Sequence, residues 1–246
     1  MIFTYLRRGL VAGLLAGLLA GLFAFFFGET SLEGAIQLEE AAAVEEGVGV
    51  HEEEEEVFSR SIQRVGLFFA TGLFGVMVGG LFGLAYASFR GFLASSSEWS
   101  RSLSLAAAIF AGAILSPFLK YPANPPTVGD PNTIGSRTAA YFAMVALSLL
   151  VVLGAWYASR TLRARGVSAP SYQLAVGLGV TVAVGILFLV LPAAPDPGKF
   201  PARLLWDFRL SSLGTQFTLW TGLGVIFGLL CERAKRRELR ELDHRW

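Results

Sequence analysis

Six long apolar blocks constrain the fold of this chain more than any other feature. They cover about residues 9–27, 65–88, 103–119, 138–158, 173–191 and 214–231. Each is close to the roughly 20 residues that an α-helix needs to cross the hydrocarbon core of a bilayer. Charged residues are confined to the gaps between the blocks. The pattern predicts an all-α, polytopic integral membrane bundle of six transmembrane helices, with residues 1–246 forming a single transmembrane domain.

The composition excludes several classes of protein. Hydrophobic residues make up 54% of the chain and charged residues 16%, which is too apolar for a soluble domain. A single cysteine, Cys231, rules out an intrachain disulfide and any Cys-based zinc site. The sequence has no nucleotide-binding P-loop and no nucleic-acid-binding pattern, so the expected partner is membrane lipid rather than nucleic acid. Arg7 and Arg8 before the first block predict a signal anchor that is retained.

The distribution of Lys and Arg predicts the orientation, because cytoplasmic loops are enriched in these residues. With the N-terminus inside, one face holds 13 of the 20 basic residues and the other holds 7. Both termini are then cytoplasmic, and the C-terminal segment 232–246 is a basic cytoplasmic tail. The segment 28–62 becomes an extracytoplasmic loop.

Small residues recur at intervals of four in the first two spans. The first has Gly9, Gly13, Gly17 and Gly21, and the second has Gly75, Gly79 and Gly83. Glycines at this spacing let two helices approach closely, so we predict that they pack against other helices.

The outer loop 28–62 is strongly acidic. It carries 11 of the chain's 19 acidic residues between Glu29 and Glu56, with no Lys or Arg among them. Carboxylates are hard oxygen ligands for divalent cations, and an imidazole adds a nitrogen ligand. A plain solvated loop is the alternative, because blocks of like charge are usually solvated. The candidate metal ligands in this loop are Glu29, Glu33, Glu40, His51, Glu52, Glu53, Glu54, Glu55 and Glu56.

The first part of this loop is predicted to be helical. Thr30-Ser31-Leu32-Glu33 fits a capping box, which predicts a helix start near Ser31. On that helix Glu29, Glu33 and Glu40 lie close to one stripe. Like charges at this spacing repel unless a cation lies between them, which favours ion capture.

A second outer loop, residues 120–137, contains four prolines and little charge. The prolines exclude a regular helix and predict an extended segment with turns near residues 129–132. We expect Asn124, Asp130 and Asn132 on this loop to help form the entrance for a cation.

No ionisable residue lies in the middle of any predicted span. Proton-coupled transporters usually place such a group at mid-membrane, so a self-contained one is disfavoured. An intramembrane enzyme is disfavoured for the same reason, and we expect no enzymatic activity. A non-transporting scaffold or assembly factor for a transporter complex remains the alternative to a metal-uptake subunit.

Three stretches together resemble the CbtA family of cobalt-transporter subunits. They are FGETSLEGAIQLEEA (27–41), LKYPANPPTVGDPNTIGSRTAAYF (119–142) and FRLSSLGTQFTLW (208–220), in the expected order. The resemblance implies cobalt import across a prokaryotic cell membrane, linked to cobalamin synthesis. It also implies a small CbtB-like membrane partner with a His-rich motif.

The resemblance implies Co²⁺ as transported substrate, with no tightly bound cofactor.

This chain departs from the family pattern in two ways. Many relatives carry a His-rich stretch between the first two spans, where this chain has His51 and Glu52–Glu56. The family is also commonly drawn with five spans, whereas the apolar blocks here predict six.

Overall fold

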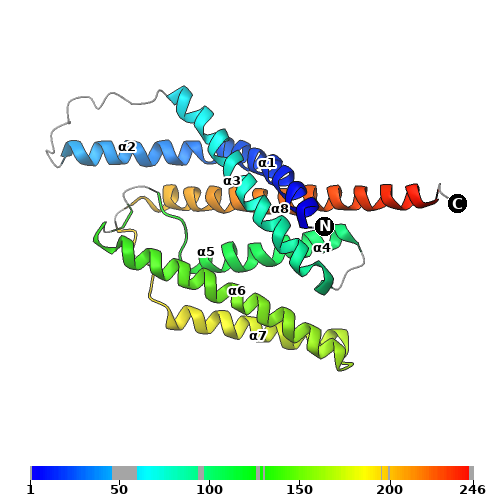
Figure 1. Ribbon diagram of the computed structural model, residues 1–246. Helices are drawn as coiled ribbons and strands as arrows, with labels where there is room; N and C mark the ends of the chain where they lie inside the picture. The colour runs from blue at the N-terminus through cyan, green and yellow to red at the C-terminus, as the bar shows by residue number, and fades with distance from the viewer. Residues whose placement is uncertain are drawn as a thin grey trace. The chain divides into compact units, whose positions relative to one another are not determined.

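The computed structural model describes residues 2–45, 60–93, 97–125, 128–129, 131–194, 196–198 and 200–243. Every regular element in these ranges is helical, as Figure 1 shows. Six helices are long and apolar enough to cross a membrane, which confirms the prediction of an all-α polytopic protein. They are Ile2–Phe27, Val65–Phe92, Glu98–Lys120, Ile134–Ala164, Ala169–Val190 and Ala202–Asp243.

The chain divides into two compact units, which are described separately. The first comprises Met1–Ala107 and Pro201–Trp246, and the second Ala108–Phe200. The helices of the first unit are α1 (Ile2–Phe27), α2 (Glu29–Glu45), α3 (Arg60–Phe89), the short η1 (Arg90–Phe92), most of α4 (Glu98–Ile109) and α8 (Ala202–Asp243).

The glycine stripes of α1 and α3 pack directly against each other. A Cβ atom on Gly13 would lie 2.8 Å from the Cα of Gly79, and one on Gly75 would lie 2.8 Å from the Cα of Gly17. Real Cβ atoms essentially never come this close, so only glycine permits the contact. The predicted packing role of Gly13 and Gly17 is therefore confirmed.

Helix α8 packs against α1 along one side and against α4 along another. A Cβ on Gly222 would lie 3.3 Å from the Cβ of Ala16 on α1. The Ser102 hydroxyl of α4 donates a 2.7 Å hydrogen bond to the Gly224 carbonyl. Buried residues of α8 include Leu219, Leu223 and Phe227, which makes α8 a central helix of the first unit.

The second unit contains the π-helical turn η2 (Phe110–Leu115), α5 (Ser116–Lys120), the short η3 (Pro131–Thr133), α6 (Ile134–Ala164) and α7 (Ala169–Val190). Buried Ser148 of α6 donates to the Gly112 carbonyl of η2. Lys120 Nζ donates a 2.8 Å bond to the Phe188 carbonyl near the end of α7. These bonds hold η2, α5, α6 and α7 together.

Several helix boundaries differ from the sequence predictions; α1, for example, begins at Ile2 rather than near residue 9. Helix α2 begins at Glu29, directly after a one-residue turn at Gly28, rather than near Ser31. The Ser31 hydroxyl donates to the Gly28 carbonyl at 3.0 Å instead of capping the helix. Helix α8 runs unbroken through the predicted last span, 214–231, from Ala202 to Asp243. The proline-rich segment before α6 is irregular at residues 122–125, as predicted, whereas residues 134–137 of the predicted loop are helical because α6 begins at Ile134.

Candidate cation site

A cavity of about 470 Å³ lies in the first unit, where α1, α2, α3 and α8 come together. Its walls consist of small and apolar residues together with polar side chains from two helices, α2 and α8. The polar residues are Glu29 and Glu33 of α2 and Ser211, Ser212, Thr215 and Gln216 of α8. None of the described residues that line it is basic. This end of the unit is the one that the basic-residue count predicts to be extracytoplasmic, and we call the hollow the outer cavity.

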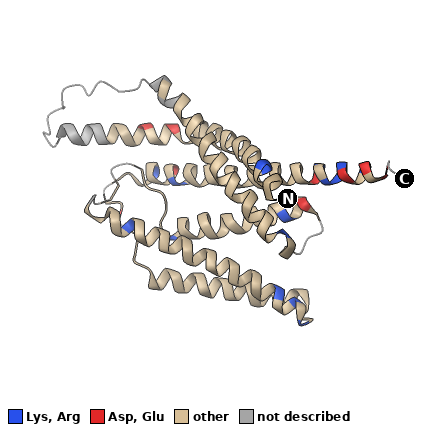
Figure 2. Ribbon diagram, in the orientation of Figure 1, with Lys and Arg blue, Asp and Glu red and all other residues tan. Residues whose placement is uncertain are grey.

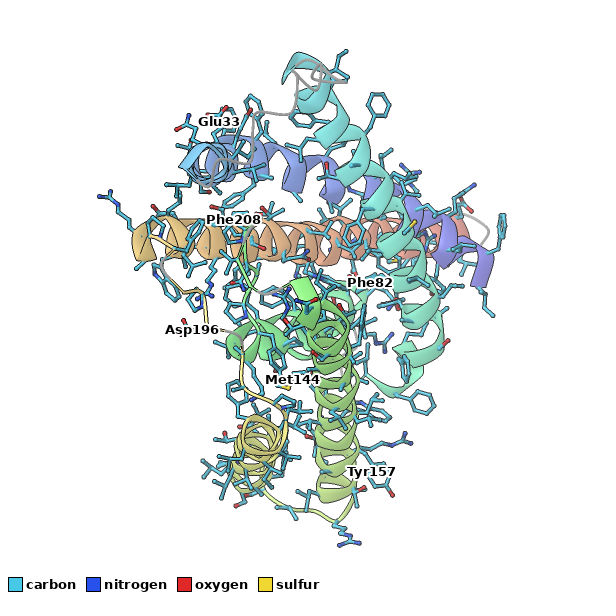
Figure 3. All side chains as sticks on the ribbon, turned by 90° about the vertical axis from the view of Figure 1, so that its left-hand side faces the viewer. Glu33, Phe82, Met144, Tyr157, Asp196 and Phe208 are labelled. Carbon is cyan, nitrogen blue, oxygen red and sulfur yellow. The ribbon has the colours of Figure 1, made fainter. Side chains whose placement is uncertain are left out.

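Glu29 and Glu33 are brought together because α2 starts immediately after α1. They lie four residues apart, which places them on one face of α2, and both side chains are half-buried. The neighbouring face of α2 is fixed on α8, since a Cβ on Gly34 would lie 3.1 Å from Leu204 Cδ1 and Ala35 is buried. The two carboxylates therefore line the cavity from an anchored helix. Figure 3 shows Glu33 on α2 and Phe208, another lining residue, on α8.

The α8 side of the cavity supplies neutral oxygen atoms. Ser211 Oγ lies 2.8 Å from the Phe27 carbonyl and 2.6 Å from the Asp207 carbonyl. Thr215 Oγ1 donates a 2.9 Å bond to the Ser211 carbonyl. A hydroxyl has one proton to donate and two lone pairs that accept, so these oxygens keep lone pairs for a cation. The bond to Phe27 also ties α8 to the end of α1, just before Glu29.

A second cavity of about 370 Å³ shares Ser211 with the first. It is lined by Thr30 and Ser31 of α2 and by Leu204, Asp207 and Leu210 of α8, among others. Asp207 brings a third carboxylate to this end of the unit, although no group of three His, Cys, Asp or Glu side chains close enough to hold a metal occurs among the described residues. The outer cavity therefore offers two carboxylates and several neutral oxygens.

Of the residues predicted as ligands, the described lining of the outer cavity includes Glu29 and Glu33. The side chain of Glu40 lies outside the described residues, as do His51, Glu52–Glu56 and Asp130. Asn124 and Asn132 lie in the second unit, on the segment before α6. Their part in a cation site stays a prediction.

Sequence reasoning missed the four polar residues of α8. The signal was present in the stretch FRLSSLGTQFTLW, where Ser211, Ser212, Thr215 and Gln216 recur at helical spacing inside an apolar region. Hydroxyl and amide side chains are common in membrane helices for packing, so this pattern alone could not assign them to a site.

The charge distribution of the described helices agrees with this picture. Figure 2 shows Lys, Arg, Asp and Glu near helix ends and in connecting segments, with the central turns of the apolar helices uncharged. A cation that crosses the first unit would meet carboxylates only near the helix ends.

Comparison with known families decides the identity of the chain. The family model described as probable cobalt transporter subunit (CbtA) matches residues 2–232, which is nearly the whole chain. This chain belongs to the CbtA family. No curated protein and no solved structure matches it.

Membership in the CbtA family makes the chain a multi-pass membrane subunit of a cobalt transporter, with Co²⁺ as the implied substrate. The word subunit implies that further chains complete the transporter. The match includes both polar faces of the outer cavity, since α2 and the first 31 residues of α8 lie within residues 2–232.

Proposed function

We propose that this chain captures Co²⁺ at the outer cavity and passes it into the helical bundle. The observation that carries the proposal is the meeting of Glu29 and Glu33 with the hydroxyl and amide oxygens of α8 around one cavity. Carboxylate and neutral oxygens are suitable ligands for divalent cations. Uptake of labelled Co²⁺ by cells with and without this chain, with its partner subunit present in both, tests the proposal.

The size of the outer cavity fits a cation that keeps much of its water. Six waters occupy about 180 Å³, at roughly 30 Å³ each in the liquid. The cavity of about 470 Å³ can therefore hold a hydrated divalent cation beside the two carboxylates. Capture then requires only partial loss of the hydration shell, which lowers the cost of entry.

The acidic segment beyond α2 has a different proposed role. Glu52–Glu56 and His51 would raise the local cation concentration near the outer cavity, because clustered charge of one sign attracts counter-ions. That attraction is screened beyond about 8 Å at physiological ionic strength. We therefore propose the segment as a collector and the cavity as the specific site.

Replacing Glu52–Glu56 by Gln should consequently reduce uptake only when Co²⁺ is scarce. We expect the half-saturating Co²⁺ concentration to rise by about three- to tenfold, with the maximal rate unchanged. Initial rates over a range of Co²⁺ concentrations, at low and at physiological salt, measure this. The difference from the parent should shrink as salt is added, and a lowered maximal rate would contradict the collector role.

His51→Ala should shift the metal preference of uptake away from Co²⁺ toward harder ions if the imidazole is a ligand.

The orientation of the chain in the membrane decides which end of the first unit is the outer one. Reporter fusions at Trp246 and at Gly49 should lie on opposite sides of the membrane, with Trp246 cytoplasmic. A fusion at Gly166, between α6 and α7, serves as a second cytoplasmic reference. If the fusions at Gly49 and Trp246 lie on the same side, the cavity can no longer be assigned to the extracytoplasmic side on this ground.

We also propose a small CbtB-like membrane subunit as the partner. The described lining of the outer cavity offers only oxygen ligands, and these discriminate poorly between Co²⁺ and Mg²⁺ or Ca²⁺. Imidazole ligands from a His-rich partner would supply that discrimination. Uptake that stays selective for Co²⁺ without any partner chain would argue against this division of labour.

A further inference from the structure

The end of the first unit opposite the outer cavity holds a buried charged cluster. Glu98, the first residue of α4, is 3% exposed. Its Oε2 accepts a 2.6 Å hydrogen bond from the Tyr86 hydroxyl, and its Oε1 accepts bonds from Arg90 Nη2 at 3.1 Å and Arg101 Nη1 at 3.0 Å. We call Tyr86, Arg90, Glu98 and Arg101 the inner cluster. It joins the end of α3 to the start of α4.

A layer of aromatic side chains lies directly against the inner cluster. The ring of Tyr86 is 5.4 Å from that of Tyr5 on α1 and 4.9 Å from that of Phe227 on α8. Phe82, labelled on α3 in Figure 3, packs edge-on against Phe227 at 5.2 Å. Phe82, Tyr86 and Phe227 are all almost completely buried. These rings close the space between α1, α3 and α8 at this end.

The inner cluster and the outer cavity lie at opposite ends of the same helices. On α1 the cavity touches Ala24 and the aromatic layer holds Tyr5. On α8 the cavity touches Ser212, whereas Phe227 lies about four turns further along. The first unit is thus hollow at one end and sealed at the other, as expected of a transport path in which one gate is closed.

The charges of the inner cluster favour a gate that opens and closes over a purely structural contact. Two guanidinium groups flank one carboxylate, so the closed cluster carries net positive charge and repels a divalent cation. A buried ion cluster is also often no more stabilising than apolar packing of the same volume, which makes it a weak choice for a purely structural contact. Arg90 and Arg101 keep 31% and 20% of their side-chain surface exposed, so both can reach water when they leave Glu98.

We propose that the inner cluster is the inner gate of the cation path, held shut by the bonds of Glu98 to Tyr86, Arg90 and Arg101. The inference rests on the proposed capture of Co²⁺ at the outer cavity. Opening separates the start of α4 from the end of α3 and parts the aromatic layer. The Glu98 carboxylate, released from the two guanidinium groups, then becomes the first anionic oxygen that a cation meets on its way to the cytoplasmic side.

The chain contains a built-in reporter for this gate. Cys231, its single cysteine, is 2% exposed on α8, one turn beyond Phe227. Its sulfur lies 3.8 Å from Arg8 Nη1, at the same end of the unit as the inner cluster. The rate at which maleimide alkylates Cys231 in the purified full-length protein, followed by mass spectrometry, therefore measures how often this end opens. No engineered cysteine is required.

Glu98→Gln should raise the alkylation rate on the order of tenfold, because it removes a charged acceptor of three hydrogen bonds. Tyr86→Phe, which removes one donor and keeps the ring, should raise the rate by a smaller factor and guards against misfolding of the first variant. Glu238→Gln, a matched change at an exposed site further along α8, should leave the rate within twofold. The gate proposal would be overturned if the parent and both variants are folded and their Cys231 is alkylated at equal rates.

The link to the outer cavity is tested with Co²⁺ itself. Saturating Co²⁺ should raise the alkylation rate of the parent severalfold, because occupation of the outer site favours opening of the inner one. Co²⁺ bound directly at the thiol would slow alkylation, so an increase cannot arise that way. The increase should vanish in the Glu29→Gln, Glu33→Gln double variant.

The alkylation results also separate the two proposals from each other. Suppose that Glu98→Gln speeds alkylation and the parent binds Co²⁺ with measurable affinity, but Co²⁺ leaves the alkylation rate of the parent unchanged. The inner cluster is then only a structural contact, and the gate proposal is wrong. If the parent binds no Co²⁺ at all, the proposed capture site fails instead.

Discussion

Exchanging both Glu29 and Glu33 for Gln should reduce Co²⁺ uptake to about a tenth of the parent rate or less at all Co²⁺ concentrations up to those that saturate the parent. Gln keeps the size of Glu and removes its charge. Hydrogen bonds and ion contacts to a charged group are each worth about 1.5–3 kcal/mol, which corresponds to tenfold or more in binding for each carboxylate lost. Both carboxylates are half-buried and lie on a helix that packs against α8.

Initial-rate uptake by cells that produce equal amounts of each variant measures this effect. Glu238→Gln on the exposed end of α8 is the matched control and should transport like the parent. Saturation kinetics distinguish the cavity from the acidic segment, since the Glu52–Glu56 variant should recover its full rate at high Co²⁺. A double variant that transports normally would remove α2 from the site.

Gly79→Leu should prevent the first unit from assembling. A Cβ atom at Gly79 would lie 2.6 Å from the Gly13 Cα, so a leucine side chain must push α1 and α3 apart along the whole glycine stripe. Overpacking usually costs about 1–3 kcal/mol where neighbours can adjust, and backbone at this distance cannot. We expect most of the protein to be lost from the membrane or to aggregate in detergent.

Gly154→Leu on α6 is the control, because among the described residues no atom beyond Gly154's own stretch of helix lies within 4 Å of a Cβ built there. Fluorescence-detected size-exclusion chromatography and thermal unfolding in detergent compare the two variants. We expect Gly154→Leu to behave like the parent. If Gly79→Leu gives a monodisperse protein of unchanged thermal stability, the close contact of α1 and α3 is not required for the fold.

Much of the fold could be predicted because membrane spans are defined by local properties of the sequence. The blocks near residues 9–27 and 138–158 were found from apolar length alone, since the bilayer imposes that length. The glycine spacing in the first two spans also predicted close packing correctly, because a row of glycines on one face of a helix allows another helix to approach closely.

Helix boundaries were less predictable where the chain leaves the membrane. The capping-box pattern placed a helix start near Ser31, whereas the turn at Gly28 lets α2 follow α1 almost directly. Helix α8 continues well beyond its apolar block at both ends, because its polar terminal turns remain helical outside the hydrocarbon region.

The candidate site could be predicted only in part. Glu29 and Glu33 followed from acidic residues at helical spacing, which is a local signal. Their neighbours on α8 lie about 180 residues later, and no periodicity indicates which face of α8 meets α2. Glu98 was missed as well, because its burial depends on Tyr86, Arg90 and Arg101 folding around it. In the sequence it stands in the serine-rich stretch 95–100, where it resembles an ordinary loop acid.

We propose above all that Co²⁺ binds between Glu29 and Glu33 at the outer cavity. Equilibrium binding of radioactive Co²⁺ to the purified full-length protein in nanodiscs tests it most directly, for the parent, the Glu29→Gln, Glu33→Gln double variant and the variant with Glu52–Glu56 replaced by Gln. We expect a saturable site in the parent that the Glu52–Glu56 variant retains and the double variant loses. Parent-like Co²⁺ affinity in a folded double variant would contradict it.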